Sequence, residues 1–519
     1  MRLERTKNSI RSIAWGLANR ALVIVFPFII RTIIIHQLGA EYAGLNSLFS
    51  AVLKVLNMAE LGFAGAVSFS MYKPAAEEDV PKMCALMQFY RRLYTVTGCI
   101  VLAVGIAAVP FLDRLVEGSV PANTNLYVLY GIYLLETATS YFIGAYRSVL
   151  LSVHQRNDIA SKINSGLHLV TYALQISLLL VFKNYYLYIL LDLAYCVVYN
   201  ILVARRVSIM YPNYRCKGKL PKGEIRDILK NVYAVILFKV CGVIRSSLDN
   251  VFISAMMGLT ATAIFGNYFF VISALTMVQT VVQNAIKGGI GNSIVTKSKE
   301  ENYREMNKFI LIYAWFSGLC TALLIGLYQP FIKLWMGPEL MVDNMTMVLF
   351  CAYFYMMTVG SIRYIYHQCS GLYYHRRYWT VAEALMNLVG NYFFIQLWGM
   401  KGILISTILS MFVVDFLYSS RIVFDYYFQN RKINQYYLRH LFYMLITAVA
   451  CAASYFLCEL IQIEGILAIL VRAIVCFVVS NFIFLAAYSR MDCFPDAVLI
   501  AKKSNKIIKK MLRGRKAEK

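Results

Sequence analysis

Six basic residues lie inside long apolar runs of this 519-residue sequence, where a positive charge is expensive to bury. They are Arg20, Arg31, Lys54, Lys239, Arg245 and Arg472. Each costs about 2.5 to 3.5 kcal/mol on membrane-insertion scales, so cations at such positions usually face a protein interior or a water-filled cavity. Guanidinium groups bind phosphate oxygens bidentately, and a lysine adds a compact positive charge. These residue types therefore indicate a buried anion site, for which a diphosphate is a suitable ligand.

Five of these cations can share one cavity. Arg20 and Arg31 are eleven residues apart, and eleven helical steps of about 100° return to within about 20° of the start, so both lie on one helix face. Lys54 lies in the next apolar run, and Lys239 and Arg245 share a later one. We expect these five to bind the anion.

Ordinary structural roles remain open for three of the cations. Arg245 and Asp249 are four residues apart on one helix and can neutralise each other. Arg31 is about one turn from the end of its apolar run and can extend its charge into the interface. Arg472 reads as a local or interfacial charge.

Acidic residues inside apolar runs raise the question of ion coupling. They are Glu60, Glu136, Asp192, Glu383 and Asp415. Intramembrane carboxylates commonly relay protons or bind cations, so we expect proton or sodium coupling at Glu60, Glu136 or Asp249. Pairing with a neighbouring cation is the alternative, and Asp415 with Arg421 is the clearest such pair.

No motif for catalysis or for a cofactor is present. The 12 cysteines contain no CxxC pair, the 6 histidines form no HExxH or other ligand spacing, and no GxxxxGK[ST] phosphate loop occurs. We therefore expect no enzyme activity, no bound metal and no cofactor.

The composition is that of a polytopic membrane protein. Hydrophobic residues make up 60% and charged residues 15%, against about 45 to 50% and about 25% in soluble domains. The sequence contains fourteen apolar stretches close to the roughly 20 residues that a helix needs to cross a bilayer. They are 11–36, 45–71, 90–112, 124–147, 160–182, 185–204, 231–257, 262–286, 309–330, 345–366, 379–398, 402–421, 441–458 and 465–488. The sequence thus predicts an all-α fold with about fourteen transmembrane helices.

Charge placement orients these helices. With a cytoplasmic N-terminus, the outer loops hold only Arg114, Lys183, Lys333 and Lys401, and most of the other Lys and Arg residues fall on inner segments. Cytoplasmic loops carry such an excess, so both termini are predicted inside. The net charge of +24 is therefore mostly an orientation signal and requires no nucleic acid.

A basic segment containing Pro and Gly interrupts the helical pattern after the sixth span. It covers residues 210–223 and reads as a linker between two halves. The predicted organisation is a six-helix lobe at 1–209, this cytoplasmic linker, a second six-helix lobe at 224–430, two additional helices at 431–490 and a basic cytoplasmic tail at 491–519.

The two halves show a weak internal repeat. Gly39 and Asn46 in QLGAEYAGLNSLF correspond to Gly258 and Asn267 in MMGLTATAIFGNYFF, at offsets of 219 and 221 residues. Each copy follows a span with buried cations. Repeats of this kind are usual in transporters, with the substrate site at the repeat interface, although chance similarity of apolar sequence is the alternative.

Three segments resemble a known family. They are LGAEYAGLNSLFSAVLKVLNMAELGFAGAVSFSMYKP at 38–74, DNVFISAMMGLTATAIFGNYFFVI at 249–272 and GGIGNS at 288–293. They are similar to the polysaccharide and O-antigen flippases of the multidrug/oligosaccharidyl-lipid/polysaccharide exporter superfamily. The resemblance implies a V-shaped pair of six-helix lobes, two additional helices, and alternating-access movement of a polyprenyl-diphosphate-linked oligosaccharide across the bacterial inner membrane. Polysaccharide biosynthesis enzymes and membrane lipids would be its partners.

A carried oligosaccharide would also need polar contacts for its hydroxyl groups. Asn46, Asn267, Gln279 and Gln283 lie in or beside spans and are the candidates for these contacts.

Two other functions remain as alternatives. A drug or organic-cation exporter of the same superfamily would require carboxylates and aromatic walls in its cavity. A membrane-embedded polysaccharide polymerase or ligase would require a substantial outer domain, whereas the longest predicted outer segment, 330–345, is short.

Overall fold

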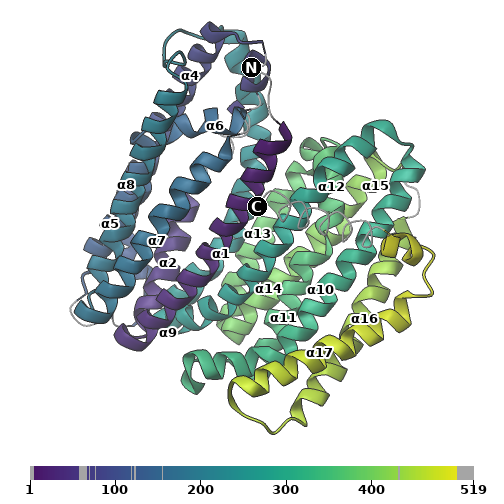
Figure 1. Cartoon of the computed structure of the whole chain (residues 1–519). Coiled ribbons are helices and arrows are strands. Elements are labelled where there is room, and N and C mark those ends of the chain that lie inside the picture. Colours follow the sequence, from purple (N-terminus) through teal and green to yellow (C-terminus); the bar gives the residue numbers. More distant parts are fainter. Residues whose placement is uncertain are drawn as a thin grey trace, which may run out of the picture. The chain divides into compact units, whose positions relative to one another are not determined.

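The computed structural model describes residues 5–57, 67–68, 70–75, 77–118, 120–121, 124–154, 156–429 and 433–499. For the helical residues 5–18, 20, 227, 230–239, 245, 246, 285 and 373 only the backbone is described. Among the described residues every regular element is a helix, which confirms the all-α prediction (Figure 1).

The chain forms two compact units, of which the first comprises Met1–Asn267 and Asn391–Ile403. In this unit α1 packs along α7, and α5 and α7 both pack along α8. Its complete helices are α1 (Arg5–Leu38), α2 (Ala40–Leu56), α4 (Val80–Ala108), α5 (Leu126–Phe142), α6 (Val149–Val153), α7 (Asn157–Phe182) and α8 (Tyr185–Met210), with the 3-10 helices η1 (Val109–Leu115) and η2 (Ala145–Ser148).

The second unit comprises Tyr268–Gly390 and Leu404–Lys519. Here α10 packs along α11, α16 and α17 (Figure 1). Its complete elements are α10 (Lys299–Met336), η3 (Pro338–Leu340), α11 (Asn344–Val359), α12 (Ser361–Cys369), the π-helix η4 (Met411–Tyr418), α15 (Ser419–Tyr426), α16 (Ile433–Glu459) and α17 (Gly465–Tyr488). Three helices contribute residues to both units, namely α9 (Lys222–Thr296), α13 (Tyr373–Trp398) and α14 (Met400–Ser410).

The helices are those of a multi-pass membrane protein. Within the described residues ten helical stretches are long and apolar enough to cross a membrane, or eleven if α5 and the bent segment Ala145–Val153 form one span. Each of the fourteen predicted spans falls wholly or partly on a helix. The counts differ because α9 joins two predicted spans, α2 has only 17 described residues, and α13 is not among these stretches.

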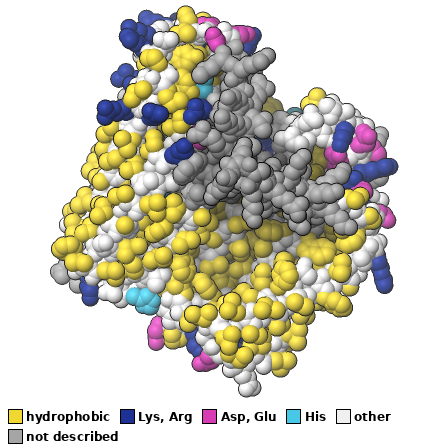
Figure 2. All heavy atoms as spheres, in the orientation of Figure 1, with side chains coloured by type: hydrophobic (Ala, Val, Ile, Leu, Met, Phe, Trp, Pro, Cys, Tyr) yellow, Lys and Arg dark blue, Asp and Glu magenta, His cyan; other side chains and the backbone are white. Residues whose placement is uncertain are grey.

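Many large apolar side chains on the long helices are exposed on the protein surface, as contact with lipid requires. Large apolar side chains such as Val181, Phe482 and Phe456 are 69 to 72% exposed, and on the face shown in Figure 2 hydrophobic groups cover the long sides of the helices. Such extensive apolar exposure is not found on soluble monomers. On the same face most Lys and Arg side chains lie in the upper part of the view or along its right edge (Figure 2).

The two glycines of the proposed repeat lie at backbone breaks. Gly39 separates α1 from α2 with a φ of 112°, and Gly258 interrupts α9 with a φ of 83° and a ψ of 179°. Residues with a Cβ rarely adopt these conformations. Both copies of the repeat therefore place glycine at the point where one helix stops and the next begins.

The segment between α8 and α9 rests on the first unit. The His154 ring lies 4.5 Å from the Tyr211 ring, and the Cys84 thiol donates to the Asn213 carbonyl at 3.4 Å. In the first turn of α9, Glu224 pairs with Lys82 at 3.1 Å. This segment is the predicted linker, and the predicted lobe boundaries on either side of it remain a prediction. Residues 500–519 of the predicted tail lie outside the described residues.

Candidate functional site

Arg31 on α1 forms a hydrogen bond with Asn267, one of the two asparagines of the predicted repeat. Its Nε donates to Asn267 Oδ1 at 2.6 Å, and its Nη2 donates to the Ala263 carbonyl at 3.2 Å. Asn267 is fully buried on α9, within the first unit. Arg31 is therefore bound by protein oxygens, so the structure brings together a predicted phosphate ligand and a predicted sugar contact.

Gly266 and Ala263 also take part in this contact, although the sequence analysis predicts neither as a site residue. A Cβ on Gly266 would lie 2.6 Å from Arg31 Nη2 and 2.7 Å from Ser47 Oγ, so glycine provides the space that the guanidinium occupies. The sequence signal was present, because Gly266 directly precedes the repeat residue Asn267.

The same stretch of α9 touches two other segments of the first unit. A Cβ on Gly44 of α2 would lie 2.1 Å from the Leu259 carbonyl oxygen. The Glu117 amide, after η1, donates to the Ser254 carbonyl at 3.0 Å. Residues 254–267 of α9 are therefore held by three separate segments, from α1, α2 and the chain after α4.

Gly44→Ala is expected to destabilise this contact strongly, because the added methyl group meets a backbone carbonyl that cannot rotate away. Overpacking of this kind costs about 1 to 3 kcal/mol or more. The measurement is the apparent melting temperature of the purified protein. Gly131→Ala on α5 is the matched control, since nothing lies within 4 Å of its Cβ position and alanine favours a helix. Equal melting temperatures for the two variants would contradict the close approach.

Asn46 lies among buried tyrosines. Ser50 donates to its Oδ1 at 3.2 Å, and the Tyr185 and Tyr188 hydroxyls are within its hydrogen-bonding reach. The Tyr185 hydroxyl also shares a 3.0 Å hydrogen bond with Tyr133. In this structure Asn46 thus belongs to a packed polar cluster, and its contact with a sugar stays a prediction.

Two acids are close together in the first unit. Glu136 on α5 and Asp192 on α8 are near enough for their charges to interact. Gln175 donates to Asp192 Oδ1 at 2.7 Å and to the Tyr188 carbonyl at 3.3 Å. Such an arrangement can hold a shared proton or a small cation between the carboxyl groups.

Asp249 on α9 is only 2% exposed and accepts a hydrogen bond from Asn391 at 2.8 Å. A buried carboxylate can exchange a proton or bind a cation. Its predicted pairing with Arg245 involves a side chain outside the described part.

The remaining predicted site residues divide into those with described side chains and those without. Lys54 on α2 is exposed. Gln279 is 3% exposed and donates to Ser361 Oγ at 2.7 Å, and Gln283 is partly exposed. The side chains of Arg20, Lys239 and Arg245, and the whole of Glu60, lie outside the described residues.

The second unit contains a buried charge cluster around Asp415. Arg363 Nη2 donates to Asp415 Oδ2 at 2.8 Å, and the Arg363 Nη1 donates to the Asp415 carbonyl. Arg376 donates to Asp415 Oδ1 and, at 3.3 Å, to Glu383. Arg363, Arg376 and Glu383 are each 5% exposed or less.

The cluster corrects the sequence interpretation of Asp415. The predicted partner Arg421 is exposed, and the Asp415 carboxylate instead bridges Arg363 and Arg376. Arg421 is six residues away, about 240° around a helix, which places it on another face. Asp415 lies in the π-helix η4, whose wider turns often occur at functional positions.

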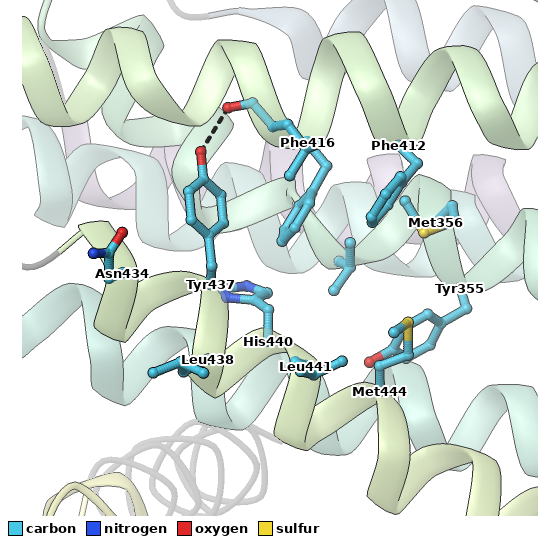
Figure 3. A pocket seen from close by; sticks show the side chains of 12 residues that line it. Tyr355, Met356, Phe412, Phe416, Asn434, Tyr437, Leu438, His440, Leu441 and Met444 are labelled. Carbon is cyan, nitrogen blue, oxygen red and sulfur yellow. Dashed lines mark hydrogen bonds between the residues drawn. The ribbon is translucent and has the colours of Figure 1, made fainter.

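An apolar cavity of about 450 Å³ lies beside η4. Phe412 and Phe416 of η4 face Leu441 and Met444 of α16 across it, and the Tyr437 hydroxyl donates to the Leu417 carbonyl at 2.7 Å (Figure 3). No Lys or Arg lines this cavity. It is therefore unsuited to a diphosphate.

No family model matches this sequence, and no curated protein matches it. Solved structures share its fold. The lipid II flippase MurJ in an inward closed conformation aligns with a TM-score of 0.62 at 12% identity, covering 92% of this chain and 99% of that one. An inward-facing multidrug resistance MATE family transporter of the MOP superfamily aligns with a TM-score of 0.55 at 16% identity, covering 79% and 98%. A MOP superfamily transporter from Pyrococcus furiosus aligns with a TM-score of 0.54 at 12% identity, covering 80% and 96%.

These similarities confirm the predicted fold. The chain has the architecture of MOP superfamily transporters, the superfamily that the sequence segments resemble. The three structures are those of transporters, and related structures have been solved in inward-facing and outward-facing conformations. The chain therefore shares the fold of these transporters.

Proposed function

We propose that this chain is a flippase that moves a polyprenyl-diphosphate-linked oligosaccharide from the cytoplasmic to the outer leaflet, for cell-surface polysaccharide synthesis. The observation that carries the proposal is the extent of the structural match. The lipid II flippase covers 92% of the chain, whereas the multidrug transporters cover about 80%. The proposal therefore takes the lipid flippase as the better guide to the substrate class.

The proposed diphosphate site consists of the cations that the apolar helices carry. They are Arg20, Arg31, Lys54, Lys239 and Arg245. In the described conformation Arg31 is bound to Asn267 and Ala263, so its contact with a diphosphate requires that this hydrogen bond opens. Arg31 then has two roles in alternation: it holds α1 to α9 in one state and binds the anion in another.

The proposed sugar contacts are Asn46, Asn267, Gln279 and Gln283. We also propose that the protein lies in the bacterial inner membrane with both termini in the cytoplasm. Two six-helix lobes would be joined by residues 210–223, and polysaccharide biosynthesis enzymes would be its partners. Fusion of a reporter that fluoresces only in the cytoplasm to the C-terminus tests the orientation. A dark fusion that is present at normal abundance would place the C-terminus outside.

A drug or organic-cation exporter is the second candidate. The observation in its favour is the set of acids on the helices of the first unit, the partly exposed Glu136 and Asp192 and the buried Asp249, because carboxylates attract cations. The substrate distinguishes the two candidates. A lipid diphosphate requires the cations of α1 and α9, and an organic cation requires the acids.

Transport by the full-length protein in proteoliposomes tests the proposal. A fluorescent polyprenyl-diphosphate oligosaccharide in one leaflet, and a fluorescent organic cation in the lumen, are offered in parallel. The proposal expects movement of the lipid-linked sugar and none of the cation above protein-free vesicles. Movement of the cation alone would replace the proposal with the exporter.

We further propose that the Glu136 and Asp192 pair couples transport to a proton or sodium gradient. Glu136→Gln and Asp192→Asn keep the side-chain size and remove the charge that exchanges with the ion. Each is expected to abolish the increase in transport rate that an imposed gradient produces, while passive equilibration remains. Glu41→Gln on the exposed start of α2 is the control. If both variants respond to the gradient like the intact protein, coupling lies elsewhere, and Asp249 is the next residue to test.

A further inference from the structure

A second cavity lies in the second unit and contains none of the proposed transport residues. It has a volume of about 490 Å³ and is formed where α10 ends and α17 begins. Its lining includes the charged residues Lys333, Glu464 and Arg472 and the apolar residues Leu334, Ile463 and Ala468. α10 and α17 run side by side in this unit (Figure 1).

Arg472 is a partly buried cation that the sequence analysis assigns as a local or interfacial charge. It lies seven residues after Gly465, two turns into the apolar helix α17. Its Nη2 donates to the Ile461 carbonyl at 3.1 Å, but its buried Nε has no acceptor and no acid pairs with it among the described residues. A buried guanidinium donor without an acceptor is rare, because desolvation is then uncompensated. Arg472 therefore lacks an anionic partner.

The other charges of the cavity leave it positive. Lys333 pairs with Glu464 at 3.4 Å, but their side chains are 58% and 87% exposed, so this pair is weak and readily rearranged. The cavity lining thus contains two cations, Arg472 and Lys333, and one carboxylate, that of Glu464. Gln329, the neutral polar group of the lining, is occupied by the Val342 carbonyl and the Tyr268 hydroxyl.

The flanks of the cavity are apolar and exposed. Leu334 is 51% exposed and Ile463 is 45% exposed, and α17 is apolar enough to cross a membrane. A ligand here would thus have an anionic group beside the two cations and hydrocarbon against the flanks. Guanidinium binds phosphate with paired hydrogen bonds, and basic pockets between transmembrane helices bind anionic lipid headgroups.

We propose that this cavity binds the phosphate group of a membrane lipid, which Arg472 and Lys333 hold together. The bound phosphate would accept from the guanidinium of Arg472 on α17 and from the ammonium of Lys333 on α10, and so would tie these two helices. Both an anionic phospholipid of the bilayer and a polyprenyl diphosphate present this chemistry. The site does not depend on the proposed function, because it uses none of the transport residues.

Native mass spectrometry of the purified full-length protein tests the site. The intact protein is titrated with phosphatidylglycerol and with diacylglycerol of the same acyl chains, which lacks only the phosphate-containing headgroup. We expect at least tenfold more bound phosphatidylglycerol than diacylglycerol at equal concentration. Equal binding of the two lipids by the intact protein would overturn the proposal, whatever any variant does.

Paired variants locate the binding. Arg472→Gln combined with Lys333→Gln is expected to reduce phosphatidylglycerol binding about tenfold, and Arg114→Gln, a cation at another loop, is expected to leave it unchanged. A double variant that elutes as a monodisperse species and still binds like the intact protein would contradict the site. Competition with polyprenyl diphosphate then identifies the source of the phosphate: displacement at tenfold lower concentration assigns the site to the transported lipid, and weaker competition assigns it to the bilayer.

Discussion

Replacement of Asp415 by Asn is expected to destabilise the protein more than any other single change considered. The carboxylate accepts hydrogen bonds from both Arg363 and Arg376, whose side chains are at most 5% exposed. The neutral amide leaves two buried guanidinium groups with Glu383 as the acid that remains in contact with Arg376. Loss of one partner from a buried ion cluster costs about 3 kcal/mol or more, because the remaining charge is uncompensated.

The measurement for Asp415→Asn is the apparent melting temperature in detergent, together with the yield of monodisperse protein. Asp425→Asn is the matched control, because Asp425 is an exposed acid on the adjoining helix α15. The control is expected to behave like the intact protein. An Asp415→Asn variant that melts with the control would show that the cluster contributes nothing to stability.

Replacement of Arg31 by Ala is expected to reduce transport at least tenfold. The substitution removes the donor to Asn267 and to the Ala263 carbonyl, and it also removes one cation of the proposed diphosphate site. A hydrogen bond from a charged group is worth about 1.5 to 3 kcal/mol, and about 1.4 kcal/mol corresponds to a factor of ten. Loss of either role is therefore large enough to measure as a rate in proteoliposomes.

Arg31→Lys and Asn267→Ala separate the two roles of Arg31. Lysine keeps the charge but cannot donate from two fixed positions, and Asn267→Ala removes the acceptor while the cation stays. If positioning of α9 dominates, both variants lose transport. If anion binding dominates, both retain most of it. Transport at the intact rate by Arg31→Ala would exclude both roles.

The helices could be predicted from the sequence because apolar length alone determines them. All fourteen predicted spans fall wholly or partly on helices, and the repeat glycines Gly39 and Gly258 both lie at breaks with positive φ. The segment α9 comprises two helices that meet at a kink at Gly258, and the predicted spans 231–257 and 262–286 lie on either side of that kink.

Side-chain partners could not be predicted from local spacing, because the Asp415 carboxylate pairs with Arg363 and Arg376 rather than with the nearby Arg421. Arg31 was expected to bind an anion or to extend toward the interface, and its partner Asn267 is 236 residues away. Arg363 and Arg376 were attributed to the positive inner segments, because both lie near predicted span ends. Their common contact with Asp415 depends on the packing of α12, α13 and η4, which local spacing does not contain.

The most direct test of the proposed diphosphate site is transport of a polyprenyl-diphosphate oligosaccharide by the intact protein, Arg20→Ala and Arg245→Ala, each reconstituted at equal density. The account predicts transport by the intact protein and its loss in both variants, with normal insertion and monodisperse elution. A third arm with polyprenyl alcohol, which lacks the diphosphate, is expected to show no difference between the three proteins. Unchanged transport of the diphosphate lipid by both variants would contradict the cationic site on α1 and α9.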